Sequence, residues 1–479
     1  MTVLIDGSSL TATELVAVAR DEERIALAPG TVERMAESRD RVEQVLAHDA
    51  PVYGMTTGLG QHKRHRLAPD QVELFNRQLI DNHRIAHGDP APGDVVRATM
   101  VRLANGFAKG TTGVRPVLAQ RLITALNDEA PPVVRLLGSS GTADLAPLAD
   151  LAHALFADVP LQAKEGLALV NNNAFSTGFA TLALSDARNL VDTLSLAGAL
   201  DMEAFGANVS ILHEAVGELR PYPGLLTELG TLRRALAGSR LWQPGAARNL
   251  QDPLSYRGIA QVGGAARDAL SFALGQLAVE LNGHHDNPIV VPGEELIISA
   301  GNYEAIAMAS ALDFVRIALA TSLTSALERA MKLLQTPLSD LPGGLSEREG
   351  LTFGGLGAIS WSAHALTAEA RLLAQPVSFE LATTTPEEGI GDRITMAPLA
   401  ARRLAEQVSL GRRVTAIELL CAAQAVQLRD AGPLGASTAR ALELVRSAVG
   451  FAGADQPYPS DLEGLVSLIA SGALAQAVR

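Results

Sequence analysis

The sequence predicts a mainly α-helical protein, in which a loop-rich N-terminal part precedes a bundle of long helices. Hydrophobic residues make up 47% of the chain but aromatic residues only 4%. The core must therefore consist of Ala, Leu and Val, and Ala and Leu are strong helix formers. Residues 303–335 and 396–430 are Ala- and Leu-rich and lack an internal proline, apart from Pro398 near a start. Glycine- and proline-rich loops interrupt the first 190 or so residues.

These patterns predict two domains, with residues 1–190 as a loop-rich active-site domain and residues 191–479 as a long-helix domain. Loops such as 53–60, 138–147 and 171–178 are rich in Gly or Asn. Long loops inside a compact domain are usually functional or disordered, and this composition favours function. Runs of about 30 residues form helices of about 45 Å, which pack side by side in a bundle.

Charge and composition exclude several classes of protein. The formal net charge is −13 and the basic residues form no long run, so we expect no nucleic-acid or membrane partner. Cys421 is the only cysteine, which excludes an intrachain disulfide and a thiolate metal site within one chain. The first residues do not resemble a secretory signal, and no apolar window reaches the roughly 18 residues of a membrane span. We therefore expect a cytoplasmic protein.

Sequence motifs of several common enzymes are missing. The chain has no Walker A loop, His-Glu-x-x-His, Gly-x-Ser-x-Gly or dinucleotide fingerprint. The sequence therefore offers no motif that would support a kinase, a zinc protease, a serine hydrolase or an NAD-dependent enzyme.

Several segments, in the right order up to about residue 430, follow motifs of one known family. They are Tyr53-Gly-Met-Thr-Thr-Gly-Leu-Gly, Leu79-Ile-Asp-Asn-His83, Asp144-Leu-Ala-Pro-Leu-Ala149, Gln251-Asp-Pro-Leu-Ser-Tyr-Arg257, Glu280-Leu-Asn, Asp286-Asn-Pro288 and Gly301-Asn-Tyr303. Together they resemble the aromatic amino-acid (histidine, phenylalanine and tyrosine) ammonia-lyase and aminomutase family. The resemblance implies the ammonia-lyase fold, which is like that of fumarase and aspartase, with a long central helix bundle and a loop-rich N-terminal head. It also implies a homotetramer whose active sites combine loops of several subunits.

The resemblance fails at the residues that form the family's cofactor. In that family an Ala-Ser-Gly tripeptide cyclises and loses water to give methylidene-imidazolone, and the serine supplies the methylidene carbon. Between Gly141 and Asp144 this chain has only Thr142 and Ala143 where the family has three residues, and neither is Ser or Gly. Without that serine the methylidene carbon has no source. We therefore predict that the protein has no cofactor.

Other family positions have changed as well. Leu254 stands where the family has its catalytic Tyr, and Gly391 stands where a glutamate is expected. Asn172 and Asn173 replace the Gly-Thr of the family's Asn-Gly-Thr. The matching residues that remain are Tyr53, His83, Asn171, Gln251, Arg257 and the aromatic Tyr303.

A second interpretation of the short stretch stays open. A matured cofactor is sometimes written as one residue, so Ala143 could stand for a cyclised Ala-Ser-Gly. In that case Thr142 would be an insertion, and the unbroken numbering leaves no gap for two absorbed residues. The changes at Leu254 and Gly391 also favour a chain without the cofactor.

The remaining polar residues suit acid–base chemistry on a small carboxylate. By resemblance, Arg257 anchors a substrate carboxylate through its planar fork of donors; a salt bridge to a neighbouring helix is the alternative. By resemblance Tyr53 acts as a base on a loop that closes over the site, although a phenol needs help to lose its proton; a packed loop aromatic is the alternative. His83 could shuttle protons or bind substrate, or only complete a helix end.

Further side chains receive supporting roles. Asn171 and Gln251 would orient polar groups, and Leu254 would belong to the substrate-binding site. Tyr303 would line the pocket or belong to the core. His284-His285-Asp286 could ligate a metal in principle, but adjacent residues rarely point at one ion; we expect no metal. Glu387 or Glu388 could replace the missing glutamate, although Pro386 and Gly389 indicate an exposed turn.

The favoured interpretation is a lyase-type enzyme that acts without the cofactor. It would catalyse an elimination, an addition or cyclisation, or an isomerisation on a small substrate that carries a carboxylate. A conventional ammonia-lyase or aminomutase with a matured cofactor at 143, and a non-catalytic ligand-binding homologue, are the alternatives.

Overall fold

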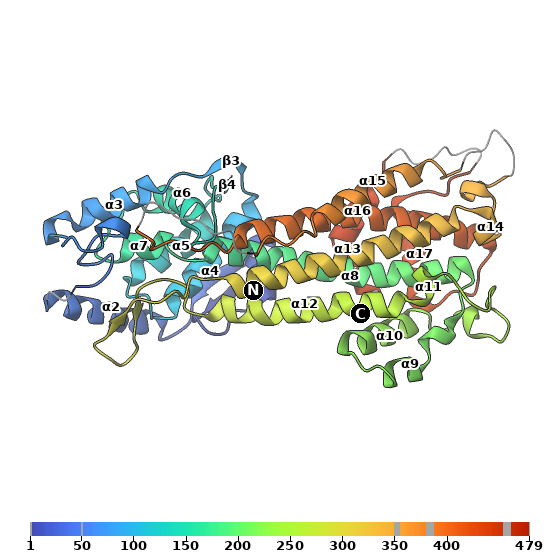
Figure 1. The fold of residues 1–479 in the computed structure, drawn as a ribbon, viewed down its shortest axis with the longest axis horizontal. Coiled ribbons are helices and arrows are strands. Elements are labelled where there is room, and N and C mark those ends of the chain that lie inside the picture. Colours follow the sequence, from blue (N-terminus) through green and yellow to red (C-terminus); the bar gives the residue numbers. More distant parts are fainter. Residues whose placement is uncertain (1, 49–50, 349–354, 380–387, 454–460, 479) are drawn as a thin grey trace. The chain divides into compact units, whose positions relative to one another are not determined.

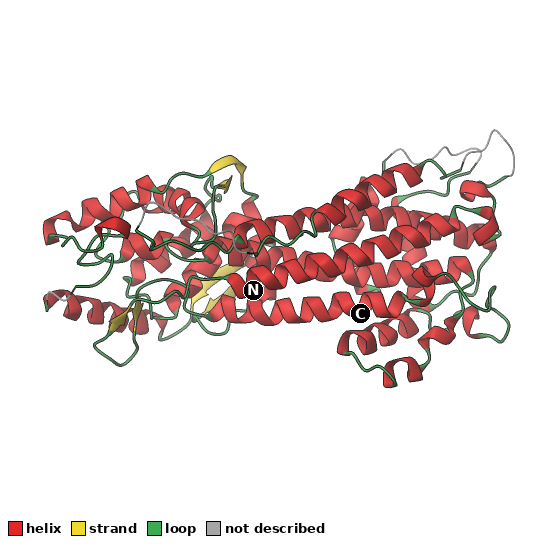
Figure 2. Ribbon diagram, in the orientation of Figure 1, coloured by secondary structure: helices red, strands yellow, loops and turns green. Residues whose placement is uncertain are grey.

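The computed structural model describes residues 2–48, 51–348, 355–379, 388–453 and 461–478. Helices account for most of these residues, and the strands are short (Figure 2). The mainly α-helical class predicted from the sequence is confirmed.

The chain divides into two compact units, and each is built from three separate segments. Unit 1 comprises residues 1–185, 273–312 and 376–402, and unit 2 comprises 186–272, 313–375 and 403–479. The boundary expected near residue 190 lies close to the end of the first segment of unit 1. Two later segments also belong to unit 1, which no local composition change indicates.

Unit 1 holds short helices and three two-stranded sheets. Its helical elements are α1 (Ala12–Arg20), α2 (Thr31–Ala47), η1 (Gly60–His62), η2 (Pro69–Gln71), α3 (Val72–Asn82), α4 (Gly93–Ala108), α5 (Pro116–Asp128), α6 (Leu145–Phe156) and α7 (Glu165–Val170). Its strand pairs are β1 (Thr2–Ile5) with β2 (Arg24–Leu27), which are parallel, and the antiparallel pairs β3 (His87–Pro90) with β4 (Arg135–Leu137) and β5 (Ile289–Val290) with β6 (Ile297–Ile298).

Unit 2 consists of helices and the loops between them, without a β-strand element among its described residues. Its elements are η3 (Val209–Leu212), α9 (Glu214–Glu218), α10 (Pro223–Ala235), η4 (Arg240–Trp242), α11 (Leu254–Arg257), α14 (Thr336–Ser339), η5 (Gly343–Leu345), α15 (Ile359–Leu372), α17 (Ala436–Ala448), α18 (Glu463–Ala470) and α19 (Ala473–Gln476).

Four long helices begin in one unit and end in the other: α8 (Ala174–Phe205), α12 (Ile259–Asn282), α13 (Ile306–Leu333) and α16 (Ala397–Arg429). The predicted long helices at 303–335 and 396–430 correspond to α13 and α16. Within unit 2 the parts of these helices pack side by side (Figure 1). A Cβ on Gly411 of α16 would lie 2.6 Å from Leu190 of α8 and 3.3 Å from Leu323 of α13, so a glycine permits this close approach.

Among the described residues, α13 is long and apolar enough to cross a membrane by length and composition. However, 61% of its apolar window is buried inside the protein. A buried core helix has the same composition, because a helix that is hydrophobic on all sides can be covered by protein as well as by lipid.

The predicted loop 171–178 is shorter in the structure, because α8 begins at Ala174. The side-chain oxygen of Asn172 accepts a hydrogen bond from the Ala174 amide at 2.9 Å, and Asp144 accepts one from the Ser176 amide at 2.7 Å. These two side chains satisfy amides that the first turn of a helix leaves without a partner.

Candidate active site

The loop that corresponds to the family's cofactor tripeptide connects β4 to α6 in unit 1. Its backbone is unusual, since φ is +109° at Gly138, +81° at Gly141 and +56° at Ala143. A left-handed conformation costs a non-glycine residue about 1–2 kcal/mol, so the fold must hold Ala143 in place. A Cβ on Gly141 would lie 2.2 Å from the Thr395 hydroxyl oxygen, so this position requires glycine.

Residues 393–396 hold this loop through three hydrogen bonds. The Met396 amide donates to the Ser140 carbonyl at 2.9 Å, and the Thr395 hydroxyl donates to the Gly141 carbonyl at 3.0 Å. The Thr142 hydroxyl donates to the carbonyl of Arg393. The loop is therefore fixed through three successive residues.

Asp144 ends the loop and lies fully buried. Its amide donates to the Asn172 carbonyl at 2.7 Å, and its Oδ2 accepts from the Ser176 amide and hydroxyl. Burial raises the pKa of the Asp144 carboxyl to about 7, against the opposing effect of the Ser176 hydrogen bonds, and the charge of Glu280 raises it further. Oδ1 has no hydrogen-bond partner among the described residues.

Tyr53 lies half-buried on the loop that precedes η1. Its hydroxyl oxygen accepts a hydrogen bond from the Gly60 amide at 3.2 Å. The loop closes further through the Leu67 amide, which donates to the Thr56 carbonyl at 2.9 Å. An amide aimed at the phenol oxygen favours its negative form, because a donor stabilises charge on the oxygen that it contacts.

His83 follows the last residue of α3 and is half-buried. Its Nδ1 lies 2.7 Å from the Leu79 carbonyl oxygen. Since a carbonyl only accepts, Nδ1 carries the hydrogen in this contact, and Nε2 of the neutral ring can then accept a proton. The same contact also completes a helix end, which was the alternative role considered for this residue.

Asn171 and Tyr303 are both half-buried in unit 1. Asn171 follows α7, and its amide donates to the Leu167 carbonyl at 2.8 Å. Its side chain forms no hydrogen bond with a described residue, unlike those of Asn172 and Asn173. Tyr303 lies in the turn before α13.

Gln251, Leu254 and Arg257 belong to unit 2 and are exposed. Leu254 begins α11 and is 68% exposed. Arg257 ends α11, and its Nε donates to the Asp252 carbonyl at 3.1 Å. No described carboxylate pairs with Arg257, so its terminal nitrogens remain available to a ligand.

Glu387, one of two proposed substitutes for the missing glutamate, lies outside the described residues. Glu388 is exposed and binds Lys63, with its Oε2 2.6 Å from Nζ. The hydrogen bond from Lys63 lowers the pKa of the Glu388 carboxyl. This carboxylate is thus paired with the Tyr53 loop.

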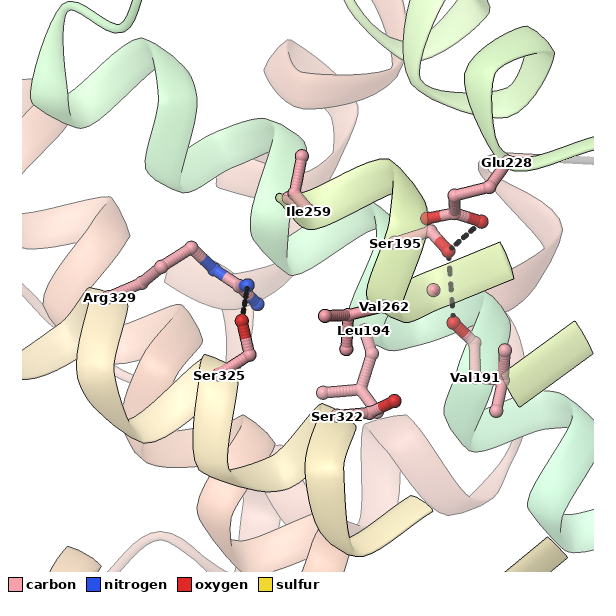
Figure 3. Close-up of a pocket in the computed structure, with 10 residues that line it drawn as sticks. Val191, Leu194, Ser195, Glu228, Ile259, Val262, Ser322, Ser325 and Arg329 are labelled. Atoms are coloured by element: carbon pink, nitrogen blue, oxygen red, sulfur yellow. Dashed lines mark hydrogen bonds between the residues drawn. The ribbon is translucent and has the colours of Figure 1, made fainter. Parts of the chain in front are cut away.

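A cavity of about 20 Å³ lies inside unit 2 (Figure 3). Arg329 and Ser325 of α13 meet at 3.1 Å on one side, and Ser195 of α8 donates to Glu228 at 2.9 Å on the other. This volume suits about one water molecule, so the cavity is too small for a substrate.

Comparisons with known proteins agree with the motifs. The family model described as aromatic amino acid lyase matches residues 10–160 and 156–447. The chain belongs to the aromatic amino acid lyase family. A protein named histidine ammonia-lyase from Symbiobacterium thermophilum is 34% identical, over 98% of this chain and 97% of its own. A histidine ammonia-lyase from Myxococcus xanthus is 35% identical, over 100% and 98%.

Solved structures of the family confirm the expected fold. The tyrosine aminomutase from Streptomyces globisporus matches with a TM-score of 0.92 and 27% identity, covering 100% of this chain and 98% of that one. The histidine ammonia-lyase from Trypanosoma cruzi matches with a TM-score of 0.90 and 27% identity, covering 100% and 95%. The ergothioneine-degrading enzyme ergothionase from Treponema denticola matches with a TM-score of 0.90 and 25% identity, covering 99% of both chains.

In this member of the aromatic amino acid lyase family, the charge of the half-buried Glu280 acts on Asp144, and the charge of the buried Arg102 acts on Glu280. Asn173 donates to Glu280 at 2.6 Å, and Arg102 donates to the Gly283 carbonyl at 3.0 Å. Burial raises the pKa of the Glu280 carboxyl, and the charge of Arg102 lowers it. Burial lowers the pKa of Arg102 to about 10, so the guanidinium still carries its charge at neutral pH.

The residues considered as metal ligands form a different charged group in unit 1. Asp286 lies 2.7 Å from the ammonium of Lys164 and 2.8 Å from Nε2 of His284, and Nδ1 of His284 lies 2.8 Å from the Thr111 hydroxyl. His285 is buried, and neither ring nitrogen has a partner among the described residues. Burial lowers the pKa of His285 well below its usual value, so this ring is neutral.

Sequence reasoning assigned no role to Arg102, Lys164 or Glu280. Each is a charged residue in a mostly apolar stretch, and charged residues are rarely buried without a partner. That pattern indicates that Arg102 and Lys164 are buried and paired and that Glu280 is partly covered, but it does not identify their partners far along the chain.

Proposed function

We propose that this chain is a lyase-type enzyme that acts without methylidene-imidazolone, by acid–base chemistry on a small carboxylate-bearing substrate. The proposal rests on one observation: residues 141–144 lack the Ser and Gly from which the family's cofactor forms, while the chain keeps Tyr53 and His83. The reaction would be an elimination, an addition or cyclisation, or an isomerisation.

The residues at the cofactor position do not fit the family's group. Residue 142 is a threonine, and loss of its hydroxyl would leave a methyl-substituted carbon in place of a methylidene. Residue 143 is a buried alanine at φ +56°, where the family's tripeptide has the glycine whose nitrogen closes the ring. The Thr142 hydroxyl is also engaged by the Arg393 carbonyl. The proposed reaction therefore does not use that group.

Tyr53 and His83 are the proposed acid–base residues. The Gly60 amide at 3.2 Å from the Tyr53 oxygen supports a phenolate that removes a proton. The contact of His83 Nδ1 with the Leu79 carbonyl supports Nε2 as the atom that accepts or returns a proton. Arg257 would anchor the carboxylate through the two nitrogens that its contact with Asp252 leaves available.

We also propose that the protein is a homotetramer with sites shared between subunits. Phe272 and Phe314 are about half exposed and lie edge to face, with ring centroids 6.4 Å apart. They neighbour a groove of about 620 Å³ that Phe314, Ile317 and Tyr222 line. Exposed apolar surface of this kind is typical of subunit interfaces, and the exposure of Gln251 and Arg257 suits contact with another subunit's substrate.

Three measurements test the proposal. The intact mass should equal that of the encoded chain, because cyclisation would remove two water molecules. A substrate is first found by screening amino acids and α,β-unsaturated acids by mass spectrometry. Tyr53→Phe should then abolish turnover while substrate still binds, and an unchanged rate would remove Tyr53 from the mechanism.

Subunit sharing has its own test. Tyr53→Phe and Arg257→Met chains, each inactive alone, are unfolded, mixed and refolded together. Sites built from different subunits should regain a fraction of the activity, because some sites then receive both intact residues. No recovery, in mixtures that light scattering identifies as tetramers, would contradict shared sites.

The similarity to proteins named histidine ammonia-lyase favours a second candidate, a conventional ammonia-lyase or aminomutase with a matured cofactor at 143. A mass lower by two waters and the near-ultraviolet absorbance of the family chromophore would support it. Tight ligand binding with no product after long incubation would favour a non-catalytic homologue.

A further inference from the structure

Residues 62–66, His-Lys-Arg-His-Arg, form a short basic turn on the Tyr53 loop. All of these residues except Lys63 are exposed. The turn carries three permanent positive charges within five residues, in a chain whose formal net charge is −13. A local charge opposite to that of the whole protein attracts anions that the rest of the surface repels.

The fold holds the basic turn against Tyr53. The Gly60 amide, in the 3-10 helix that includes His62, donates to the Tyr53 oxygen at 3.2 Å. The Gly58 amide donates to the His65 carbonyl at 3.0 Å, and Arg66 pairs with Thr57 in a β-bridge. The basic turn therefore lies beside the Tyr53 loop, and its positive charges are close to Tyr53, the proposed base.

A carboxylate from a distant segment of unit 1 contacts this turn. Glu388 forms an ion pair with Lys63 at 2.6 Å, and the charge of Arg64 also acts on the Glu388 carboxyl. Arg64 forms no ion pair with any described residue. An exposed guanidinium beside an existing ion pair is available to a ligand, and its five donors suit the oxygens of an anion.

The same short segment of chain also reaches the loop at the cofactor position. Glu388 contacts the basic turn, and five residues later the Arg393 carbonyl accepts the Thr142 hydroxyl. Five residues span at most about 18 Å. The basic turn and Thr142 thus contact two points of one segment that lie at most about 18 Å apart along the chain.

We propose that the basic turn binds a multiply charged oxyanion of the phosphate type on the substrate, at the end remote from the bond that reacts. The proposal rests on the proposed function and specifies its substrate class. A single carboxylate is satisfied by one arginine fork, whereas a phosphate group brings nearly two charges and three acceptor oxygens. Lys63, Arg64 and the two histidines supply the matching donors.

The test titrates the full-length protein with inorganic phosphate and measures binding by calorimetry at low salt. The wild type should bind phosphate, and Arg64→Gln should weaken binding at least tenfold without disturbing the Lys63–Glu388 pair. The control is Arg24→Gln, which removes another exposed unit 1 cation, 62% exposed and 3.4 Å from Asp128. Its affinity should equal that of the wild type, and added salt should weaken all binding.

Three results would overturn the proposal. They are no phosphate binding by the wild type, equal losses in Arg64→Gln and Arg24→Gln, or succinate binding as tightly as phosphate. Equally tight succinate binding would indicate that the basic turn binds a second carboxylate of the substrate and not a phosphate. Thermal midpoints of both variants should match the wild type, which excludes misfolding as the cause.

Binding and turnover separate this proposal from the proposed function. Tyr53→Phe should keep phosphate binding, because it removes the hydroxyl that accepts the Gly60 amide but takes no positive charge from the turn. If Tyr53→Phe abolishes turnover while phosphate does not bind, the acid–base proposal stands and the phosphate proposal fails. If phosphate binds through Arg64 while Tyr53→Phe retains full activity, the acid–base proposal fails.

Discussion

One carboxylate oxygen of Asp144 accepts both the amide and the hydroxyl of Ser176, at 2.7 and 2.9 Å. The other carboxylate oxygen is buried without a partner among the described residues. This contact joins the end of the loop at 141–144 to the first turn of α8. The contribution of this buried carboxyl to stability therefore depends on pH.

Replacing Asp144 with Asn should remove a pH dependence of stability. Burial raises the pKa of Asp144 from 3.8 to about 7 in the folded state, so the folded chain binds its proton more tightly than the unfolded chain. Stability from this group is therefore present below pH 4 and is lost as the pH rises to about 7. Each pKa unit corresponds to about 1.4 kcal/mol, so the loss is at most about 4 kcal/mol. Denaturant unfolding of both proteins from pH 4 to 8 measures the difference, and parallel curves would contradict it.

Replacing Gly106 with Ala should destabilise unit 1. A Cβ there would lie 1.6 Å from Cε1 of His285, and overpacking of this kind costs about 1–3 kcal/mol. Gly275 is the matched control, a helical glycine whose Cβ would meet nothing within 4 Å. Gly275→Ala should be neutral or stabilising by up to about 1 kcal/mol, because alanine favours helix. Thermal unfolding compares the two, and equal midpoints would refute the close contact.

Replacing Arg329 with Met should destabilise unit 2 by about 3–5 kcal/mol, because a buried ion group loses its cation. Arg329 lies 3.1 Å from Asp201 and 2.5 Å from Glu418, and all three are buried. Burial and then the charge of Glu418 raise the pKa of Asp201 well above its usual value, which favours the protonated form of this carboxyl. Asp201→Asn should therefore cost much less.

The control for Arg329 is the exposed pair Arg440–Glu443 at 2.8 Å. Exposed pairs contribute about 0–1 kcal/mol, so Arg440→Met should change stability little. Denaturant unfolding gives all three values. Similar losses in Arg329→Met and Asp201→Asn would indicate that Asp201 is ionised.

Replacing Arg257 with Lys should raise KM about tenfold or more with little change in kcat. Lysine keeps the charge but loses the planar fork, and a hydrogen bond to a charged group contributes about 1.5–3 kcal/mol. Steady-state kinetics on the substrate found by screening measures the effect, with Arg440→Lys as the control. An unchanged KM would leave Arg257 without a role in carboxylate binding.

The fold could be predicted from the sequence because its signals are local. The Ala- and Leu-rich runs at 303–335 and 396–430 correspond to α13 and α16, and the motif from Asp144 to Ala149 corresponds to the start of α6. Helix periodicity and proline breaks depend only on neighbouring residues.

The partners inside the site could not be predicted in the same way. Thr142 contacts Arg393 across 251 residues, and Lys164 contacts Asp286 across 122. No periodicity encodes such pairs, because tertiary packing decides them. For the same reason, the adjacency of His284, His285 and Asp286 does not reveal that Asp286 binds the Lys164 ammonium and that His285 faces Gly106.

The pairing of Lys164 with Asp286 also affects how the protein is made. When the ribosome has completed Lys164, its partner carboxylate is still 122 residues away, and the last segment of unit 1 ends only at residue 402. The nascent chain must therefore keep a lysine and its apolar neighbours unburied through much of translation. Such intermediates are prone to aggregation, so overexpression should depend on chaperones and slow synthesis.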